Sequence, residues 1–363
     1  MRIALAGGGT GGHVYPAIAV AEQLRALGNV DLAYYGTEHG VEHEIARREG
    51  ITFRAVPASQ VRVRKPVALA KGLWRLWQGS RTAKRWLEAD RPRAVFATGG
   101  YAAAPVGRAA KQAGIPLIVF LPDAYPGWAV KFLARYATTV ACAVDAAVDE
   151  FPPGKAVVTG YPLRGQFAQA TREDGRQRFS LEKDLPTVLV AGGSLGARAI
   201  NDAVIEALPD WLGVAQVIHV AGRGDFDRVR EATTSLPDEV RGRYHLTDYT
   251  EEMAYAMAAA DIAVMRAGAS TLGELAASGL PVIAIPGAFS DQARNAEYLA
   301  SRGAAVHLPQ SQIDALRQLV LGLIEDGDRR AEMRARMRAL GRPDAARSLA
   351  EMVLDLAERE VAA

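Results

Sequence analysis

The sequence predicts an α/β protein made of two Rossmann-like domains whose parallel sheets face each other across a cleft. The chain has 363 residues, and a single hydrophobic core usually stops growing at about 250–300, so two domains are expected. Short apolar runs alternate with helical patterns along the chain, as in βαβ units. Each half also begins with a strand, a glycine-rich loop and a helix.

Nine short β-rich runs predict the strands of the two sheets. They lie at residues 2–6, 30–35, 94–97, 117–120 and 139–143 in the first half, and at 187–191, 216–220, 262–265 and 282–285 in the second. A hinge-like connector at 157–164 separates the halves, and two helices separated by Gly341-Arg-Pro343 are expected over 310–363. The predicted domains are therefore an N-terminal domain (1–160), a C-terminal domain (165–342) and a last helix (343–363), for which packing on the N-terminal domain is one option.

Composition excludes several classes of protein. Apolar residues make up 49% and charged residues 23% of the chain, which is ordinary for a globular protein. The net charge of +2 argues against a general polyanion binder. The single cysteine, Cys142, excludes a disulfide scaffold and lies in an apolar run, where a buried, inert side chain is expected. The longest uncharged stretches contain Gly and Pro, so no membrane-spanning helix and no signal peptide are expected.

The first glycine loop runs from Gly7 to His13, between a predicted strand and a predicted helix. Glycines let the backbone approach a phosphate, and the helix N-terminus offers unpaired N–H groups and the positive end of its dipole. Gly7, Gly9 and Gly12 also fit G-x-G-x-x-G, with Glu38 as the acid that a dinucleotide site needs. A nicotinamide-dependent dehydrogenase is therefore one reading of this loop.

Two further glycine loops follow predicted strands, at residues 97–101 and 192–198. The later one matches G-x-S-x-G, the nucleophile elbow of α/β-hydrolases, with Ser194 as the nucleophile. Three histidines come after it in the chain: His219, His245 and His307. A hydrolase needs one sheet with one elbow, however, whereas this chain has phosphate-type loops in both halves.

A fourth loop, residues 266–274, also follows a predicted strand and suits an anion through N–H groups and hydroxyls. Glu274 lies one helical turn after Ser270, where a carboxylate can accept two hydrogen bonds from vicinal hydroxyls such as those of a ribose. Gln292 offers an amide with donors and acceptors for sugar hydroxyls. The alternative readings are a solvated helix residue for Glu274 and a helix start for Gln292.

The sequence does not predict a metal site. Asp225-Phe-Asp227 and Asp326-Gly-Asp328 have the D-x-D spacing of some metal-dependent sugar transferases, but each is followed by arginine and is interpreted as a turn or helix start. His39 and His43 are four residues apart, and no third ligand accompanies them.

Taken in order, these loops resemble the MurG family, the peptidoglycan N-acetylglucosaminyltransferases of the GT-B fold (glycosyltransferase family 28). Residues 7–21 are close to the opening signature of that family, and segments 98–101, 160–164, 192–198 and 268–274 follow in register. The resemblance therefore covers almost the whole chain. It implies inverting transfer of N-acetylglucosamine from UDP-N-acetylglucosamine to undecaprenyl-diphospho-N-acetylmuramoyl-pentapeptide (lipid I), which gives lipid II, with no cofactor required.

The resemblance also implies where each substrate binds, with the donor mainly on the C-terminal half. The implied donor-binding residues are Thr10, Gly11, Gly12, Arg164 beside the uracil, Ser194, Ala269, Ser270 and Thr271 at the nucleotide, Glu274 at the ribose and Gln292 at the sugar. The implied acceptor-binding residues are Thr10, His13, Gly99, Gly100 and Tyr101. Inverting displacement needs a base for the acceptor hydroxyl. His13 is the leading candidate, and a loop-orienting or phosphate-contacting histidine is the alternative.

Some residues depart from the pattern of the family. Residues 120–123 read Phe-Leu-Pro-Asp where the family usually has His-Glu-Gln-Asn, so Asp123 is a second candidate for the base. Leu195 replaces a glutamine, and Ser290-Asp-Gln292 replaces Asp-His-Gln. Three alternatives therefore stay open: a related GT-B glycosyltransferase with another UDP-sugar or lipid acceptor, a GT-B UDP-sugar 2-epimerase, and a nucleotide-sugar binding protein without turnover.

A basic segment rich in tryptophan predicts contact with a membrane surface. Between Arg62 and Arg93, ten Lys and Arg residues stand against two acids, and Trp74, Trp77 and Trp86 are interleaved with them. This is the pattern of an interfacial helix on anionic lipid, with Trp74, Trp77, Arg75 and Lys71 as the contacts. A core stripe with a solvated basic face is the alternative. No nucleic-acid motif accompanies the segment, and we expect a peripheral protein on the cytoplasmic face of the cell membrane.

Overall fold

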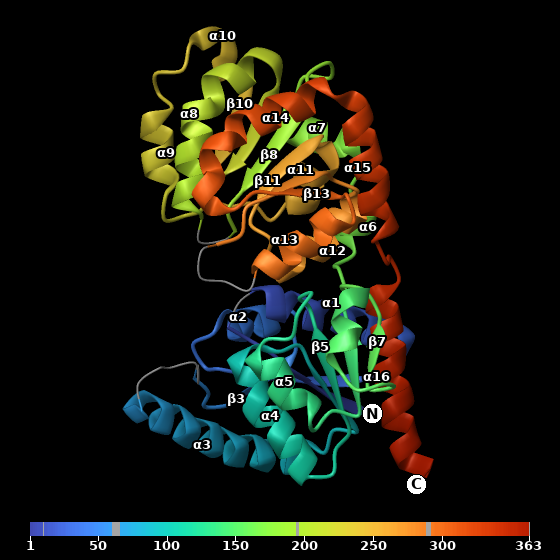
Figure 1. The fold of residues 1–363 in the computed structure, drawn as a ribbon. Helices are drawn as coiled ribbons and strands as arrows, with labels where there is room; N and C mark the ends of the chain where they lie inside the picture. The colour runs from blue at the N-terminus through green and yellow to red at the C-terminus, as the bar shows by residue number, and fades with distance from the viewer. Residues whose placement is uncertain (10, 60–65, 194–195, 288–291, 363) are drawn as a thin grey trace. The chain divides into compact units, whose positions relative to one another are not determined.

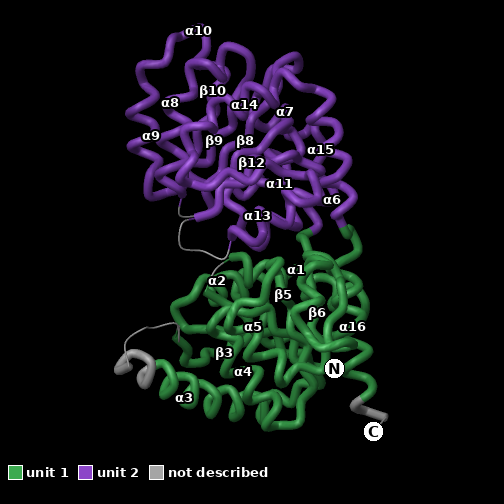
Figure 2. Tube along the Cα trace, viewed as in Figure 1, with its two compact units in different colours: residues 1–164, 342–363 green, residues 165–341 purple. Residues whose placement is uncertain are grey.

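The computed structural model describes residues 1–9, 11–59, 66–193, 196–287 and 292–362, with the backbone alone at 66–71 and 360–362. The chain forms two compact units (Figure 2). Unit 1 contains Met1–Arg164 and Arg342–Ala363, and unit 2 contains Gly165–Gly341. The chain therefore passes between the units twice, and its last helix belongs to unit 1.

Unit 1 is built on a seven-stranded parallel sheet in the order β3-β2-β1-β4-β5-β6-β7 (Figure 1). Its strands are β1 (Arg2–Ala6), β2 (Asp31–Gly36), β3 (Thr52–Ala55), β4 (Ala94–Ala97), β5 (Leu117–Leu121), β6 (Thr139–Cys142) and β7 (Ala156–Val158). β2 and β3 lie on one side of β1, and β4 to β7 lie on the other. The strand order therefore reverses between β1 and β4. In open α/β sheets, such a switch point is where ligands bind, outside the carboxyl ends of the strands.

The helices of unit 1 pack on this sheet as parallel crossovers require. They are α1 (Gly11–Leu27), α2 (Val41–Arg48), α3 (Pro66–Asp90), α4 (Gly100–Gln112), α5 (Trp128–Ala134), η1 (Asp145–Glu150) and α16 (Ala345–Ala362). Helix α4 packs against α3 and α5, whereas α16 packs against α1 and β4. The last helix thus completes the layer that α1 begins.

Unit 2 is built on a six-stranded parallel sheet in the order β10-β9-β8-β11-β12-β13. The strands are β8 (Thr187–Ala191), β9 (Gln216–Val220), β10 (Tyr244–Thr247), β11 (Ile262–Met265), β12 (Val282–Ala284) and β13 (Ala305–His307). Its switch point lies between β8 and β11. The two sheets confirm the predicted fold class of two parallel α/β domains.

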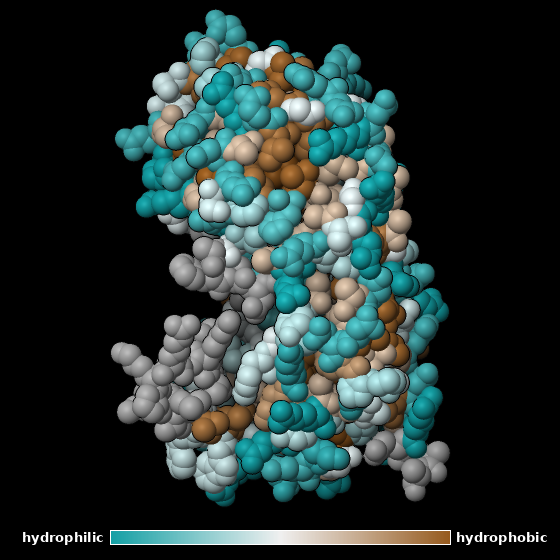
Figure 3. Space-filling view, in the orientation of Figure 1, coloured by the Kyte–Doolittle hydropathy of each residue, from teal (hydrophilic) through white to brown (hydrophobic). Residues whose placement is uncertain are grey.

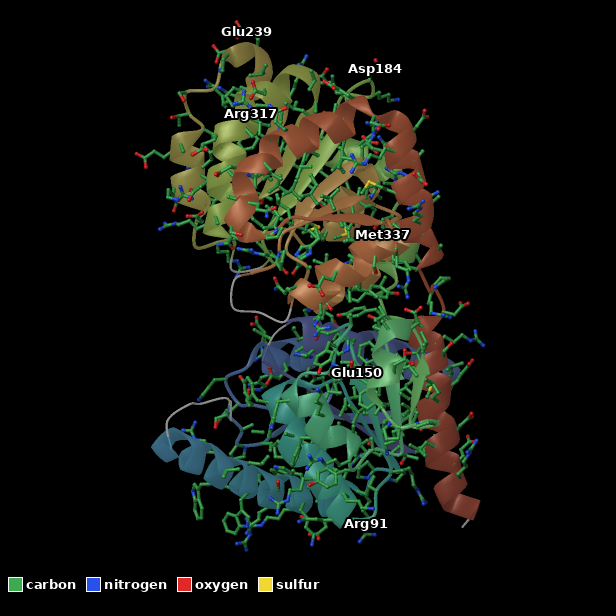
Figure 4. All side chains as sticks on the ribbon, viewed as in Figure 1. Arg91, Glu150, Asp184, Glu239, Arg317 and Met337 are labelled. Atoms are coloured by element: carbon green, nitrogen blue, oxygen red, sulfur yellow. The ribbon has the colours of Figure 1, made fainter. Side chains whose placement is uncertain are left out.

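The helices of unit 2 pack on its sheet around a core of apolar side chains. They are α6 (Gln166–Gln169), α7 (Arg172–Arg178), α8 (Arg198–Val214), α9 (Phe226–Ala232), α10 (Asp238–Arg241), α11 (Met253–Ala259), α12 (Ala269–Ser278), α13 (Gln292–Ser301), η2 (Gln310–Ala315), α14 (Leu316–Glu325) and α15 (Gly327–Ala339). Trp211 of α8 and Met337 of α15 are fully buried, and Figure 4 labels Met337.

All nine predicted strands are present, each within one residue of its expected ends. The four strands that the sequence did not predict are β3, β7, β10 and β13, the outermost strands of the two sheets. An outer strand has one neighbour and is only partly covered, so its residues do not form a continuous apolar run. The predicted connector at 157–164 is wrong at its start. Val157 and Val158 belong to β7, which is one of these outer strands.

The expectation of two helices over residues 310–363 is wrong, because the chain also breaks before Gly327. Asp326 ends α14 and caps α15, with its Oδ1 atom accepting a hydrogen bond of 2.9 Å from the backbone N–H of Arg329. Such a side-chain cap satisfies an amide that a helix leaves unpaired. The interpretation of Asp326-Gly-Asp328 as a helix start is thereby confirmed.

Two further expectations concern the interior and the membrane. Cys142 is fully buried, and burial raises the pKa of its thiol to about 12, so the thiol is inert at neutral pH. Within the described ranges, no helix is both long and apolar enough to span a bilayer.

Candidate functional site

The four glycine loops flank the two switch points. In unit 1 they follow the neighbouring strands β1 and β4, and in unit 2 they follow the neighbouring strands β8 and β11. Helices α4, α8 and α12 begin at these loops, and no side chain caps any of the three N-termini. Their first N–H groups are therefore oriented to bind an anion at the carboxyl edge of each sheet.

The two loops of unit 1 pack directly on each other. A Cβ atom on Gly100 would come within 3.0 Å of the carbonyl oxygen of Gly8, and one on Gly9 would lie 2.7 Å from the ring of Tyr101. Gly9, Gly99 and Gly100 also have positive φ angles of 97°, 89° and 73°, which side-chain-bearing residues rarely adopt. Both loops therefore require glycine, and they hold Tyr101 beside the first loop.

His13 is fixed by the second loop. Its Nδ1 atom lies 2.9 Å from the carbonyl oxygen of Thr98, which can only accept, so Nδ1 donates, and in the neutral ring Nε2 keeps its lone pair. The Thr98 hydroxyl in turn donates to the backbone carbonyl of His13. Nε2 has no hydrogen bond to the described part of the chain, so this tautomer presents an unprotonated nitrogen at the start of α1.

The connector after β7 is tied to the same loop. Tyr161 is buried, and its hydroxyl donates a hydrogen bond of 3.1 Å to the carbonyl oxygen of Gly12. The guanidinium of Arg164 lies 4.4 Å from the ring centre of Tyr15 on α1. Arg164 is therefore part of unit 1, in contact with the helix that carries His13.

Asp123 follows β5, the neighbour of β4 in the sheet, and is partly exposed. The loop that it belongs to leads into α5, and Val130 of α5 lies where a Cβ on Gly99 would contact it at 3.6 Å. The loops that carry His13, Gly99 and Asp123 thus follow three adjacent strands, β1, β4 and β5.

In unit 2, the loop after β11 and the start of α13 are held together. The buried side chain of Asn295 donates a hydrogen bond of 3.0 Å to the carbonyl oxygen of Ala267. Gln292 accepts one of 3.0 Å from the N–H of Gly287 through Oε1, which orients its amide group. The sequence did not single out Asn295, although an asparagine three residues after Gln292 lies on the same face of α13.

The start of α8 is held by a buried polar network. Asn201 in the first turn of α8 donates to the carbonyl oxygen of Ala221 at 3.0 Å and to Asp225 at 2.7 Å, so its Oδ1 faces Nε2 of His219 at 3.0 Å. Nε2 therefore donates, and Nδ1 accepts from the hydroxyl of Tyr244 at 2.8 Å. Because both ring nitrogens are engaged, His219 is not available as the histidine of a hydrolase triad.

Asp225 belongs to this network and is not a metal ligand of the D-x-D kind. Arg228 binds both of its carboxylate oxygens at 2.7 Å, and hydrogen bonds from Arg228 and Asn201 hold the pKa of Asp225 well below its usual range. Among the described residues, no group of three or more His, Cys, Asp or Glu is placed to share a metal ion.

The network makes the stability of unit 2 depend on pH. Burial lowers the pKa of His219 to about 3, whereas the unfolded imidazole titrates near 6.5. Below pH 6.5 the unfolded chain binds a proton that the folded protein does not, so this stability is lost as the pH falls from about 6.5 toward 3. Between pH 6.5 and 4.5, we expect wild-type protein to lose roughly 2 kcal/mol more free energy of unfolding than His219→Gln.

Urea denaturation at a series of pH values measures this difference. The matched control is His39→Gln, at an exposed histidine of unit 1. Parallel pH curves for wild type and His219→Gln would contradict the prediction.

The sequence comparisons agree with this arrangement. Residues 3–142 match the glycosyltransferase family 28 N-terminal domain, and residues 187–349 match the glycosyltransferase family 28 C-terminal domain. The UDP-N-acetylglucosamine--N-acetylmuramyl-(pentapeptide) pyrophosphoryl-undecaprenol N-acetylglucosamine transferase of Roseiflexus sp. (strain RS-1) is 38% identical over 420 residues, which cover 99% of this chain and 96% of that relative. The chain belongs to the MurG family of glycosyltransferase family 28.

Solved structures support the same assignment. MurG of Acinetobacter baumannii is 28% identical, with a TM-score of 0.77 over 98% of this chain and 99% of that one. The UDP-GlcNAc 2-epimerase of Neisseria meningitidis superposes with a TM-score of 0.69 over 98% of this chain and 100% of that one at 13% identity, which shows a shared fold alone. Membership of family 28 makes the protein a glycosyltransferase and excludes the dehydrogenase and hydrolase readings.

The structure also gives a physical reason against a dinucleotide site in this family member. The N–H of Gly9, in the first loop, donates to the carboxyl group of Glu42 at 3.3 Å. Glu38, the acid expected for a dinucleotide, is exposed. The N–H of Gly9 is therefore not available to a dinucleotide, which leaves the N-termini of α1 and α4 as the candidate anion-binding groups of unit 1.

The structure describes most of the site residues that the sequence predicts. In unit 1 these are Gly11, Gly12, His13, Gly99, Gly100, Tyr101, Asp123 and Arg164, and in unit 2 they are Ala269, Ser270, Thr271, Glu274 and Gln292. Thr10, Ser194, Leu195, Ser290 and Asp291 lie outside the described residues, as does the side chain of Lys71.

Helix α3 presents tryptophans at the surface. Trp74 is 60% exposed and Trp77 is 40% exposed, and their rings stack at 4.9 Å. The buried side of the helix uses Leu76, Ala83 and Leu87 instead. Apolar side chains lie at the surface over α3 in Figure 3. The alternative reading, a core stripe that contains Trp74 and Trp77, is therefore wrong.

Proposed function

We propose that the protein transfers N-acetylglucosamine from UDP-N-acetylglucosamine to lipid I, with inversion at the anomeric carbon, and so forms lipid II. The observation that carries this proposal is the whole-chain similarity to a transferase of that name. The geometry supports it, because both units offer uncapped helix N-termini at a switch point, and the two substrates each carry a diphosphate.

In this proposal, unit 2 binds the donor. The N-terminus of α12, with Ala269, Ser270 and Thr271, faces the diphosphate of the nucleotide. Glu274 is partly exposed one turn later and accepts hydrogen bonds from the ribose hydroxyls. The Oε1 atom of Gln292 already accepts from Gly287, so its NH2 group donates to the sugar hydroxyls. Ser194 would belong to the same site.

Unit 1 binds the acceptor in this proposal. The N-termini of α1 and α4 bind the diphosphate of lipid I, with Gly99, Gly100 and Tyr101 as the contacts from the second loop. His13 takes the proton of the acceptor hydroxyl through Nε2, because Nδ1 already carries a proton toward Thr98. The oxygen of that hydroxyl then attacks the anomeric carbon, the bond to the diphosphate breaks, and UDP leaves with the electron pair.

The departing UDP is stabilised by the same helix N-termini that bind it. Backbone N–H groups aimed at developing charge lower the barrier without any change in the protein during the reaction. We therefore propose that no metal or other cofactor is required, which activity in the presence and absence of a chelator tests directly.

The function is tested by transfer of labelled sugar from UDP-N-acetylglucosamine to a short-chain lipid I analogue, with other UDP-sugars run in parallel. Product that depends on both substrates supports the proposal. Transfer from another UDP-sugar alone would overturn the donor assignment and implicate Leu195, Ser290 and Asp291. Release of UDP without product would overturn the acceptor assignment.

We also propose that α3 holds the protein on the cytoplasmic face of the membrane, where a polyprenyl-linked acceptor lies. Exposed Trp74 and Trp77 beside Arg75 and Arg81 form the interfacial pattern. We expect Trp74→Ala/Trp77→Ala to bind vesicles with 30% anionic phospholipid at least about tenfold more weakly, because two tryptophans no longer bury apolar area. Arg75→Gln should weaken binding to the same vesicles about fivefold, because one cationic contact with anionic lipid is lost.

Sedimentation with these vesicles measures the effect, and Val214→Ser, an exposed position of unit 2, is the matched control. Binding by the double variant at wild-type affinity would exclude α3 as the contact. If Arg75→Gln weakens binding equally on vesicles without anionic lipid, attraction between Arg75 and anionic lipid is excluded.

A further inference from the structure

Glu42 is a buried acid that the chemistry above does not use. It lies in the first turn of α2, and its side chain is completely buried. Burying a carboxyl group is costly unless hydrogen bonds satisfy its oxygens. Here Oε1 accepts from the backbone N–H of Thr37 at 2.9 Å and from the Thr37 hydroxyl at 2.7 Å, while Oε2 accepts from the N–H of Gly9 at 3.3 Å.

The backbone around Glu42 is shaped to fit this side chain. Cβ atoms on Gly8, Gly36 and Gly40 would each come within 3.0 Å of atoms in the Glu42 side chain. These glycines come from the first loop, the end of β2 and the residue before α2. The carboxyl group thus occupies a space that glycines leave open, and it connects α2 to the first loop at a fixed distance.

The same loop reaches the second loop on its other side. The carbonyl of Gly8 lies against Gly100, and Gly9 lies against the ring of Tyr101. The second loop holds His13 through the carbonyl of Thr98 at 2.9 Å. Gly8 and Gly9 are therefore packed between Glu42 and the residues that orient His13.

We infer that Glu42 is a positioning residue of the transfer reaction: it holds Gly8 and Gly9 against the second loop and so fixes the tautomer and direction of His13. The inference rests on the proposed function, since it assigns Glu42 a role only through the acceptor site. A displacement of about 1 Å at a reacting group lowers a rate by about 100-fold, and the hydrogen bond to Gly9 is what prevents it.

Glu42→Gln tests this with little change in shape. The glutamine keeps one oxygen for the two donors of Thr37 but turns its NH2 group toward the N–H of Gly9, so only that hydrogen bond is lost. We expect kcat to fall about 10- to 100-fold and the KM for UDP-N-acetylglucosamine to stay within twofold. The melting temperature should fall by only a few degrees, because the buried NH2 group and the Gly9 N–H then lack an acceptor. Glu44→Gln, at an exposed acid of the same helix, is the matched control.

Gly8→Ala disturbs the contact between Gly8 and Glu42 by adding a methyl group on the Gly8 side. Gly8 does not have a positive φ angle, and the three atoms nearest to a Cβ at this position all belong to the Glu42 side chain, so overlap with Glu42 is the main strain expected in Gly8→Ala. We expect Gly8→Ala to lower kcat like Glu42→Gln. In a Glu42→Ala background, the further loss from Gly8→Ala should be less than threefold, because the overlapping side chain is gone.

The tautomer of His13 gives a readout that does not depend on turnover. Nitrogen NMR, assigned with His13→Gln, should show Nδ1 protonated in the wild type and a mixture of tautomers in Glu42→Gln. Unchanged His13 signals with wild-type kcat would overturn the inference, as would a loss of kcat fully explained by a smaller folded fraction. If wild-type protein transfers no sugar, the proposed function fails, and the NMR comparison still decides the role of Glu42.

Discussion

His13→Gln is expected to lower kcat for transfer to the lipid I analogue at least about 100-fold. General base catalysis contributes about 10²- to 10⁴-fold, and glutamine has no nitrogen that can take a proton at neutral pH. UDP should bind to the variant with an affinity within twofold of wild type, because we assign the donor to unit 2. Single-turnover kinetics and titration with UDP measure the two quantities separately.

The comparison that decides this prediction is Asp123→Asn, since both residues follow adjacent strands of unit 1. If His13 is the base, Asp123→Asn keeps more turnover than His13→Gln. The reverse order would make Asp123 the base, and near-wild-type kcat in both variants would exclude both residues. His43→Gln is the matched control, because its Nδ1 atom also lies 3.0 Å from a backbone carbonyl, on the exposed surface of unit 1.

Gly100→Ala is expected to destabilise unit 1 by about 3 kcal/mol and to abolish transfer. Two costs add at this position. The φ angle of 73° is unfavourable for alanine by about 1–2 kcal/mol, and the new Cβ would overlap the carbonyl oxygen of Gly8, which costs about 1–3 kcal/mol of backbone displacement. Thermal unfolding should show a decrease of roughly 6–12 °C in the transition of unit 1.

Gly114→Ala separates the two costs. Gly114 has a φ angle of 71°, and a Cβ there would meet nothing within 4 Å. This control should therefore lose only the 1–2 kcal/mol that belongs to the backbone angle, and it should keep wild-type kcat. Equal destabilisation by the two variants would show that the contact between Gly8 and Gly100 is not tight.

The two sites share one design. In each unit the chain reverses its strand order between two neighbouring strands, and glycine loops follow both of them. Parallel strands end at the same edge, so loops that are about 90 residues apart in unit 1 meet across a single strand spacing. This explains why His13, Gly99 and Asp123 come from three separate segments of the sequence.

The strands that the sequence did not predict are the edge strands of the two sheets. Central strands are covered on both faces, so they appear as continuous apolar runs, such as Thr187–Ala191, and all nine were predicted. The outer strands β3, β7, β10 and β13 are only partly buried, and their residues resemble those of loops. Their pairing is decided by the sheet that they join, and local sequence does not encode it.

The sequence by itself determined the fold class, the four glycine loops and the family, because glycines at strand ends and apolar periodicity are local properties of the chain. Only the tertiary structure showed that Trp74 and Trp77 face outward, that His219 is locked between Asn201 and Tyr244, and that Glu42 supports the first loop. Each of these depends on contacts between segments that are distant in the sequence or on which side of a helix is covered. Burial and hydrogen-bond partners are set by packing, and the order of residues along the chain does not contain them.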